Sequence, residues 1–196
     1  MRPALLHPYL LGPVALLLIG GALFPSSGRD DVHIAFWSAW TLIEHGALLN
    51  YSGEALEQGS SLLHILLLAL VAAITGLEIA DIATPLSILF AALAVVEAGR
   101  LAQRLGASMH WAVALAATST PLVYWAFGAL ESTLVAYIVT AFVRSSIEAL
   151  APSANEARPL MRAVLWGVLY LLARPEAVFV ATAFVAFAGV VCLRDR

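Results

Sequence analysis

Residues 160–193 read LMRAVLWGVLYLLARPEAVFVATAFVAFAGVVCL, an apolar run of 34 residues that is interrupted near its middle. As one helix this run would be about 51 Å long, whereas the hydrocarbon core of a bilayer is about 30 Å thick. The interruption is Arg174-Pro175-Glu176, where a helix-breaking proline stands between two charges that resist burial in lipid. The run therefore predicts two helices, 160–173 and 177–193, that meet at a membrane surface.

The composition of the whole chain extends this prediction. Of its 196 residues, 62% are apolar and 12% are charged, whereas soluble domains are about 45–50% apolar and about 25% charged. Too little polar surface exists to cover a water-soluble particle, so we expect an all-α, polytopic membrane protein. The single cysteine excludes an internal disulfide framework, and a net charge of −3 without any lysine gives no reason to expect nucleic acid as a partner.

Further candidate spans are 4–24, 61–77, 80–99, 109–127 and 132–150. A cleavable signal peptide is an alternative reading of the first, because Arg2 precedes it, but no clear cleavage site closes it. If 61–77 lies along the outer leaflet instead of crossing, Arg29 and Arg174 are the only arginines on the outer side of the membrane. The other arginines are then all cytoplasmic, namely Arg2, Arg100, Arg104, Arg144, Arg158, Arg162, Arg194 and Arg196. We therefore predict six spans plus one interfacial segment.

The main polar block is 25–60, on the predicted outer side. Within it, Val32, Phe36, Trp40 and Ile43 recur at the spacing of an amphipathic helix that ends near Gly46 and suits the membrane interface. Asp30-Asp31 stands just before this helix. Either these carboxylates cap the helix, or one of them acts as a catalytic base or ligates a divalent ion. With two aspartates present, both readings can hold.

Ionisable residues gather on the same outer side. This set comprises Asp30, Asp31, Glu54, Glu57, Glu131, Arg174 and Glu176. The set indicates an outward-facing site with one positive charge for an anionic group. Alternatively, Glu131 is an ordinary interface residue and Arg174 is a helix-end cation paired with Glu176. In the cytoplasmic thirds of the spans, Glu97, Arg144 and Glu148 are expected to snorkel to the interface. The absence of mid-membrane charges and of an inverted repeat disfavours a small-solute transporter.

Four short motifs, in order, resemble the GT-C superfamily of membrane glycosyltransferases. They are Asp30-Asp31-Val32-His33-Ile34, the stretch Gly53-Glu54 to His64, Gly128-Ala129-Leu130-Glu131-Ser132, and Ala173-Arg174-Pro175-Glu176. They look like the Asp-Asp-Ala-Tyr-Ile, Gly-Glu…Glu-Gly-x-Thr-x-Pro-Leu-Trp, Gly-Leu-Glu-Thr and Thr-Arg-Pro-Glu stretches of a bacterial branch. That branch contains arabinofuranosyltransferases and related polyprenyl-phosphate-sugar enzymes. Trp37 and Trp40 stand where the family often has arginine, and Leu62 and His64 replace its proline and tryptophan.

The resemblance implies transfer of a sugar from a polyprenyl-phosphate donor to a glycan or lipid acceptor of the cell envelope. The site would face outward from a bacterial cytoplasmic membrane. Asp30 or Asp31 would be the catalytic base, Glu131 would line the site and Arg174 would contact the donor phosphate, with Glu54, Glu57 and Glu176 as further substrate-binding candidates.

The resemblance covers residues 30–176, and family members are usually much longer. The chain then corresponds to their N-terminal portion, and three readings stay open: an N-terminal half, a split subunit whose partner supplies the rest, or a decayed copy. An alternative function is a non-catalytic subunit that binds a lipid-linked sugar or assists such a partner. Gathered carboxylates allow a divalent cation, but unpaired acids and one arginine fit a metal-free mechanism equally well.

Overall fold

A computed structural model describes residues 8–24, 30–55, 59–150 and 157–194 of the chain, and these ranges contain helices and no strands. The all-α class predicted from the composition is confirmed for them. The helices are α1 (Pro8–Leu23), α2 (Asp30–His45), α3 (Leu62–Thr75), α4 (Ile79–Arg104), α5 (Met109–Ala117), α6 (Thr120–Ala126), α7 (Ser132–Ala149), α8 (Ala157–Ala173) and α9 (Ala177–Arg194).

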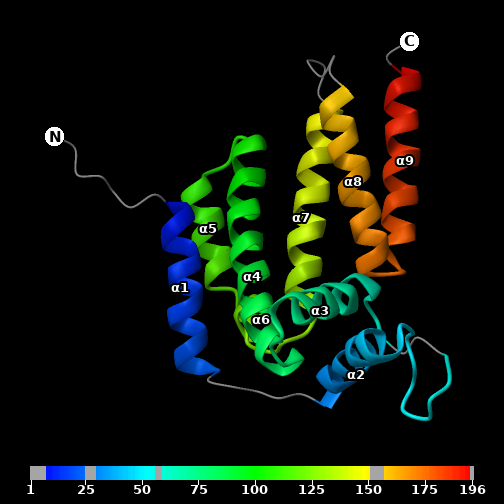
Figure 1. Cartoon of the computed structure of the whole chain (residues 1–196). Helices are drawn as coiled ribbons and strands as arrows, with labels where there is room; N and C mark the ends of the chain where they lie inside the picture. The colour runs from blue at the N-terminus through cyan, green and yellow to red at the C-terminus, as the bar shows by residue number, and fades with distance from the viewer. Residues whose placement is uncertain (1–7, 25–29, 56–58, 151–156, 195–196) are drawn as a thin grey trace.

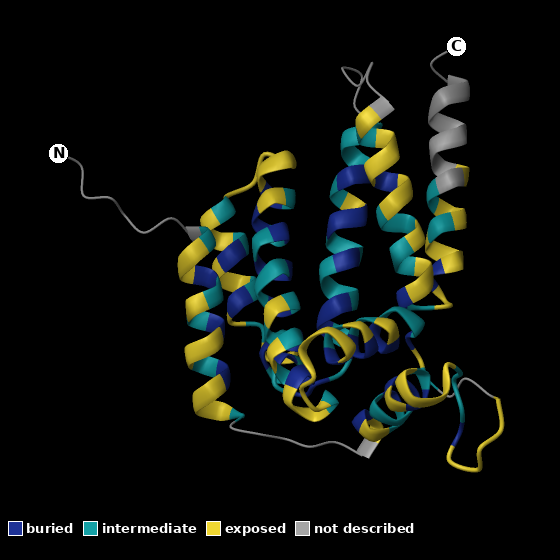
Figure 2. Ribbon diagram, viewed as in Figure 1, coloured by how far each residue is buried: buried dark blue, intermediate teal, exposed yellow. Residues whose placement is uncertain are grey.

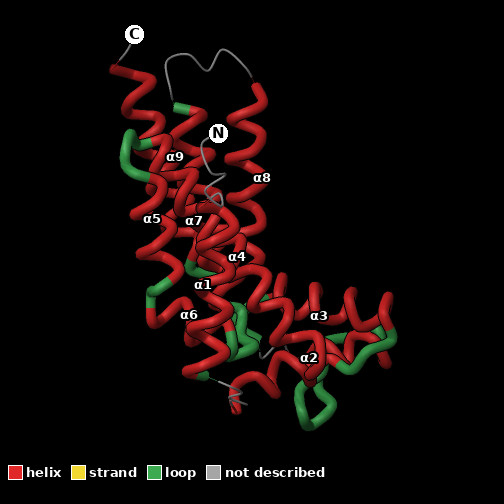
Figure 3. Tube along the Cα trace, turned by 90° about the vertical axis from the view of Figure 1, so that its left-hand side faces the viewer, coloured by secondary structure: helices red, strands yellow, loops and turns green. Residues whose placement is uncertain are grey.

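The long helices stand upright side by side, and two shorter helices lie across one end of them. In Figure 1, α1, α4, α5, α7, α8 and α9 run roughly parallel, with α7 between α4 and α8. Helices α2 and α3 lie crosswise at the lower end, and Figure 3 shows them projecting beyond the bundle to one side. The lower end also holds α6, the start of α7 and the turn between α8 and α9.

Several predicted boundaries agree with the structure. The chain breaks between α8 and α9 at Arg174-Pro175-Glu176, and α2 ends at His45 before Gly46, whose φ of +67° suits a residue without a side chain. Segment 61–77 contains the 14-residue α3, which begins after Ser61 and ends at Thr75, before Gly76. At about 21 Å, α3 is shorter than a bilayer core.

Three details differ from the sequence prediction. Helix α2 begins at Asp30, so the two aspartates form its first turn and do not precede it. Segment 109–127 is two helices, because Ser119 is extended and Pro121, which lacks an N–H, is in the first turn of α6. The helix predicted over 80–99 continues to Arg104.

The outer surfaces of the upright helices are strongly apolar. Figure 2 shows exposed residues along α1 and α8, and these include Leu10, Leu18, Met161 and Leu165. Within the described residues, α4 is the one helix that combines the length and the apolar character needed to cross a bilayer; Tyr9–Leu23 and Leu62–Thr75 are apolar but shorter.

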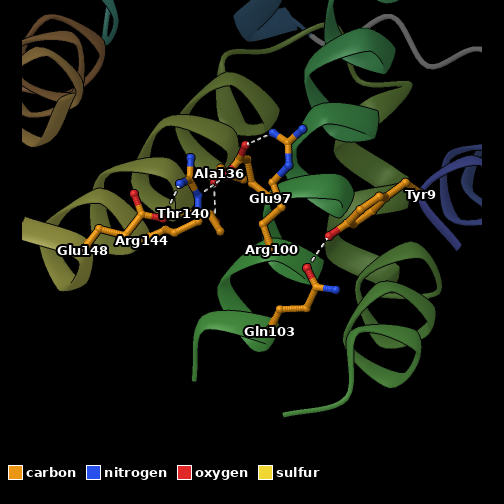
Figure 4. Close-up of polar contacts among 8 residues, drawn as sticks. All are labelled: Tyr9, Glu97, Arg100, Gln103, Ala136, Thr140, Arg144 and Glu148. Atoms are coloured by element: carbon orange, nitrogen blue, oxygen red, sulfur yellow. Dashed lines mark hydrogen bonds and ion pairs between the residues drawn. The ribbon is translucent and has the colours of Figure 1, made fainter. Parts of the chain in front are cut away.

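A charged cluster joins α4 to α7 (Figure 4), near the C-terminal ends of both helices, which point up in Figure 1. The Glu97 side chain is 4% exposed and accepts hydrogen bonds from Arg100 Nη1 at 2.6 Å and Arg144 Nε at 2.7 Å. Arg144 Nη1 also donates to Glu148 at 2.7 Å. The expectation that Glu97 snorkels to the interface is therefore wrong: its carboxylate is buried between two arginines, which offset the cost of desolvating it.

Candidate functional site

An ion pair at the lower end of the bundle joins two of the four motifs. Arg174 Nη2 lies 2.8 Å from Oε1 of Glu131, and the two side chains are 28% and 8% exposed. The Ser60 hydroxyl donates to the same Glu131 oxygen at 2.6 Å. Glu131 therefore connects three distant segments of the chain: the approach to α3, the start of α7 and the turn after α8.

The backbone before α7 places Glu131 in this position. Glu131 is the N-cap residue of α7, but its side chain makes no capping hydrogen bond and is directed to Ser60 and Arg174 instead. Two residues earlier, Ala129 has a φ of 57°, a left-handed conformation that residues other than glycine rarely adopt. The Ser87 hydroxyl of α4 donates to the carbonyl of Leu130 at 3.2 Å and fixes this turn against α4.

A cavity of about 340 Å³ opens beside the ion pair. Its walls come from the first turns of α2, the approach to α3, the α6–α7 junction and the end of α8. The lining residues are Asp31, Ile34, Ala35, Gly59, Ser60, Trp125, Leu130, Glu131, Ser132 and Arg174. One or more residues from each of the four motifs thus line the same cavity.

The electrostatics of the cavity combine one cation with two helix N-termini. Arg174 is the one basic residue among the described lining residues, and α2 and α7 both begin at the cavity wall. The N-terminal end of a helix carries partial positive charge and exposes unpaired N–H groups. Because Arg174 offsets the charge of Glu131, Asp31 is the exposed carboxylate of the lining that lacks an ion pair among the described residues. This arrangement suits an anionic group near Arg174 and proton transfer at Asp31.

The remaining predicted site residues lie elsewhere or are not described. Glu54 is exposed and does not line the cavity; its carboxylate accepts from the Asn50 side chain at 2.9 Å and closes a turn. Glu176 is 61% exposed, and its Oε1 lies 3.7 Å from Arg174 Nη1 at the cavity edge. Glu57 and the side chain of Asp30 lie outside the residues that the structure describes.

His64 is a buried ionisable residue near the ion pair. It lies in the first turn of α3, is 2% exposed, and its Nδ1 has no hydrogen-bond partner. Burial lowers the pKa of His64 to about 4, although the negative charge of Glu131 acts in the opposite direction. His64 is therefore neutral at pH 7 and stays neutral in mildly acidic solution.

Sequence reasoning did not assign Ser60 or Trp125 to the site. Ser60 belongs to the second motif, where Gly59 and Ser61 flank it. These small polar residues directly before a helix were the signal that could have indicated Ser60. Trp125 lies within the apolar run 109–127, which predicts a membrane span and no site residue. Among the described residues, no group of three or more histidine, cysteine, aspartate or glutamate side chains is placed to hold a metal ion.

No family model, curated protein or solved structure matches this chain.

Proposed function

We propose that this chain is a membrane glycosyltransferase of the GT-C type that transfers a sugar from a polyprenyl-phosphate donor to a cell-envelope acceptor. The observation that carries this proposal is the convergence of the four motifs on one cavity, where Arg174 is held by Glu131 and Asp31 lines the same cavity. An arginine suits a phosphate because its planar guanidinium offers five N–H donors, more than the contacts with Glu131 and Glu176 use.

The proposed reaction is a single displacement at the anomeric carbon. The acceptor hydroxyl oxygen forms a bond to that carbon, its proton passes to the Asp31 carboxylate, and the bond from carbon to phosphate oxygen breaks. The departing polyprenyl phosphate takes the bonding electrons and gains negative charge. Arg174 and the N-terminal ends of α2 and α7 stabilise that charge. Attack opposite the leaving group inverts the anomeric configuration.

The membrane arrangement is part of the same proposal. We place α1, α4, α5 with α6, α7, α8 and α9 as six crossings, and α2 and α3 along the outer surface of the membrane. Exposed leucine, methionine and valine side chains on α1 and α8 support this placement, because such surfaces are unstable in water. The described arginines support it as well, since Arg174 is at the lower end while Arg100, Arg104, Arg144, Arg158 and Arg162 are near the upper end.

The test is a sugar-transfer assay in purified membranes, with a panel of radiolabelled polyprenyl-phosphate sugars. Wild type is compared with an Asp30→Asn/Asp31→Asn double variant, and Glu148→Gln is the matched control at the other end of the bundle. The proposal requires transfer by wild type and by Glu148→Gln, and none by the double variant. Transfer that survives in the double variant would rule out the aspartates as the base.

Donor binding without transfer would identify the second candidate, a non-catalytic subunit for a lipid-linked sugar. The charge balance at Arg174 favours this second candidate, because Glu131 already pairs with the guanidinium and a phosphate would have to share that guanidinium. One experiment distinguishes the two candidate functions. A binding subunit still binds the donor in the Asp30→Asn/Asp31→Asn variant, and neither wild type nor this variant shows turnover, with or without added Mg²⁺.

A further inference from the structure

A second cavity, of about 750 Å³, lies on the other side of α2. It is bounded by α2, by Tyr51 and by the turn from α3 to α4. The α2 residues that line it are His33, Phe36, Trp37, Trp40, Ile43 and Glu44. At 100° per residue these occupy the face opposite Asp31, Ile34 and Ala35, which line the first cavity. Helix α2 therefore separates two cavities of different chemistry.

Three aromatic rings form a stack along this second cavity. The Trp37 ring stacks on Tyr51, at 5.0 Å between ring centroids and an interplanar angle of 29°, and is tilted against Trp40, at 5.1 Å and 36°. Trp40 and Tyr51 are 42% and 58% exposed. The indole N–H of Trp37 is buried and has no hydrogen-bond partner. The stack thus presents apolar ring faces and leaves one donor unused.

The charges around the rings restrict what can bind there. Glu44 and Glu78 line the cavity, both are exposed, and neither forms an ion pair among the described residues. No described lining residue is arginine or lysine, so a phosphate or another anion would be repelled. An acyl chain would leave two carboxylates against hydrocarbon, which is costly. A cation cage is also disfavoured, because the rings stack on one another and do not face each other across a gap.

We propose that this second cavity, hereafter the groove, binds a neutral carbohydrate chain. The C–H groups of a sugar ring pack on the electron-rich faces of Trp40 and Tyr51, while its hydroxyls donate to the carboxylates of Glu44 and Glu78. The volume is within the range of small-molecule sites. Its role as the dock for the acceptor glycan rests on the proposed function; the binding itself does not.

The test is equilibrium binding of neutral oligosaccharides to the full chain in nanodiscs of neutral lipid. Maltohexaose, mannohexaose and arabinohexaose are followed by saturation-transfer NMR and by tryptophan fluorescence. Trp40→Ala and Glu44→Gln are compared with Trp111→Ala, an exposed tryptophan on α5 that serves as the control. We expect saturable binding of at least one oligosaccharide, about tenfold weaker in Trp40→Ala and unchanged in Trp111→Ala.

Three results would overturn the proposal: no saturable binding of any oligosaccharide, equal binding by wild type and both groove variants, or binding of tetramethylammonium in place of sugars. Circular dichroism shows whether Trp40→Ala is folded, and Glu44→Gln removes an exposed charge that packing does not need. The two proposals fail separately. If Arg174→Gln still binds oligosaccharide and wild type transfers no sugar, the transferase proposal alone is refuted. If sugar is transferred but no oligosaccharide binds, the groove proposal alone is refuted.

Discussion

Arg174 pairs with Glu131, far away in the sequence, at 2.8 Å, and only at 3.7 Å with its near neighbour Glu176. The difference matters because Glu131 is almost fully buried and Glu176 is exposed. A buried carboxylate needs a partner, whereas an exposed one is solvated by water. The ion pair therefore fixes the turn between α8 and α9 to the start of α7, and with it one wall of the cavity.

This ion pair is expected to couple strongly in a double-mutant cycle. Arg174→Gln leaves the Glu131 carboxylate buried with Ser60 as its remaining hydrogen-bond partner, so we expect a loss of about 3 kcal/mol in the free energy of unfolding. Glu131→Gln/Arg174→Gln should recover much of that loss, because no uncompensated charge remains. Thermal unfolding in micelles measures both effects, and equal losses in the single and double variants would show that the pair does not couple.

His64 is expected to make stability depend on pH in the mildly acidic range. Its folded-state pKa of about 4 is below the ordinary value of 6.5, so the unfolded chain binds more protons between these pH values. The contribution of His64 is complete above pH 6.5, falls as the pH drops toward 4, and amounts to about 3 kcal/mol in total. His64→Asn should flatten the dependence of Tm on pH between 4 and 6.5. A slope that persists in His64→Asn would assign the effect to another group.

The charged cluster between α4 and α7 is expected to be structural. Glu97→Gln leaves Arg144 with one carboxylate in place of two, in a setting where the Glu97 side chain is 4% exposed. We expect it to lower the free energy of unfolding by about 3 kcal/mol. Glu148→Gln removes a more exposed partner and should lower it by about 1 kcal/mol. Thermal unfolding ranks the two variants, and a larger effect at Glu148 would contradict the buried role of Glu97.

Labelling of single cysteines tests the proposed membrane arrangement. In a Cys192→Ala background, Leu77→Cys stands after α3 and Leu105→Cys stands after α4, and both positions are exposed. If α3 lies on the outer surface and α4 crosses, a membrane-impermeant maleimide labels position 77 in intact cells. Position 105 then reacts only after the membrane is opened. The reverse pattern would show that 61–77 crosses.

Local signals in the sequence were sufficient for much of the helix arrangement. Proline between two charges predicted the break at Arg174-Pro175-Glu176, and Gly46 marked the end of α2, because both signals act on the backbone within one turn. The break within 109–127 was not predicted, although Pro121 carried the signal, since the surrounding apolar run masked it.

The site was predictable in part. Sequence position and charge predicted that Asp31, Glu131 and Arg174 lie on one side of a membrane, and the structure shows that the three residues line one cavity. The partner of Glu131 was not predictable, because Ser60 is 71 residues away in the sequence and meets it only through tertiary packing. Glu54 instead accepts from Asn50 within a local turn. Likewise, no local pattern indicated that Ala129 would adopt a left-handed conformation.

Equilibrium binding of a fluorescent polyprenyl-phosphate sugar tests most directly whether the Arg174 cavity holds the donor phosphate. Wild type is compared with Arg174→Gln, with Glu131→Gln/Arg174→Gln, in which no buried charge is left unpaired, and with Arg158→Gln, a control from the opposite end of α8. We expect binding to weaken by about tenfold or more in both Arg174 variants, the cost of one charge-assisted contact, and to be unchanged in Arg158→Gln. Binding by the folded Glu131→Gln/Arg174→Gln variant that equals wild type would contradict the assignment of this cavity.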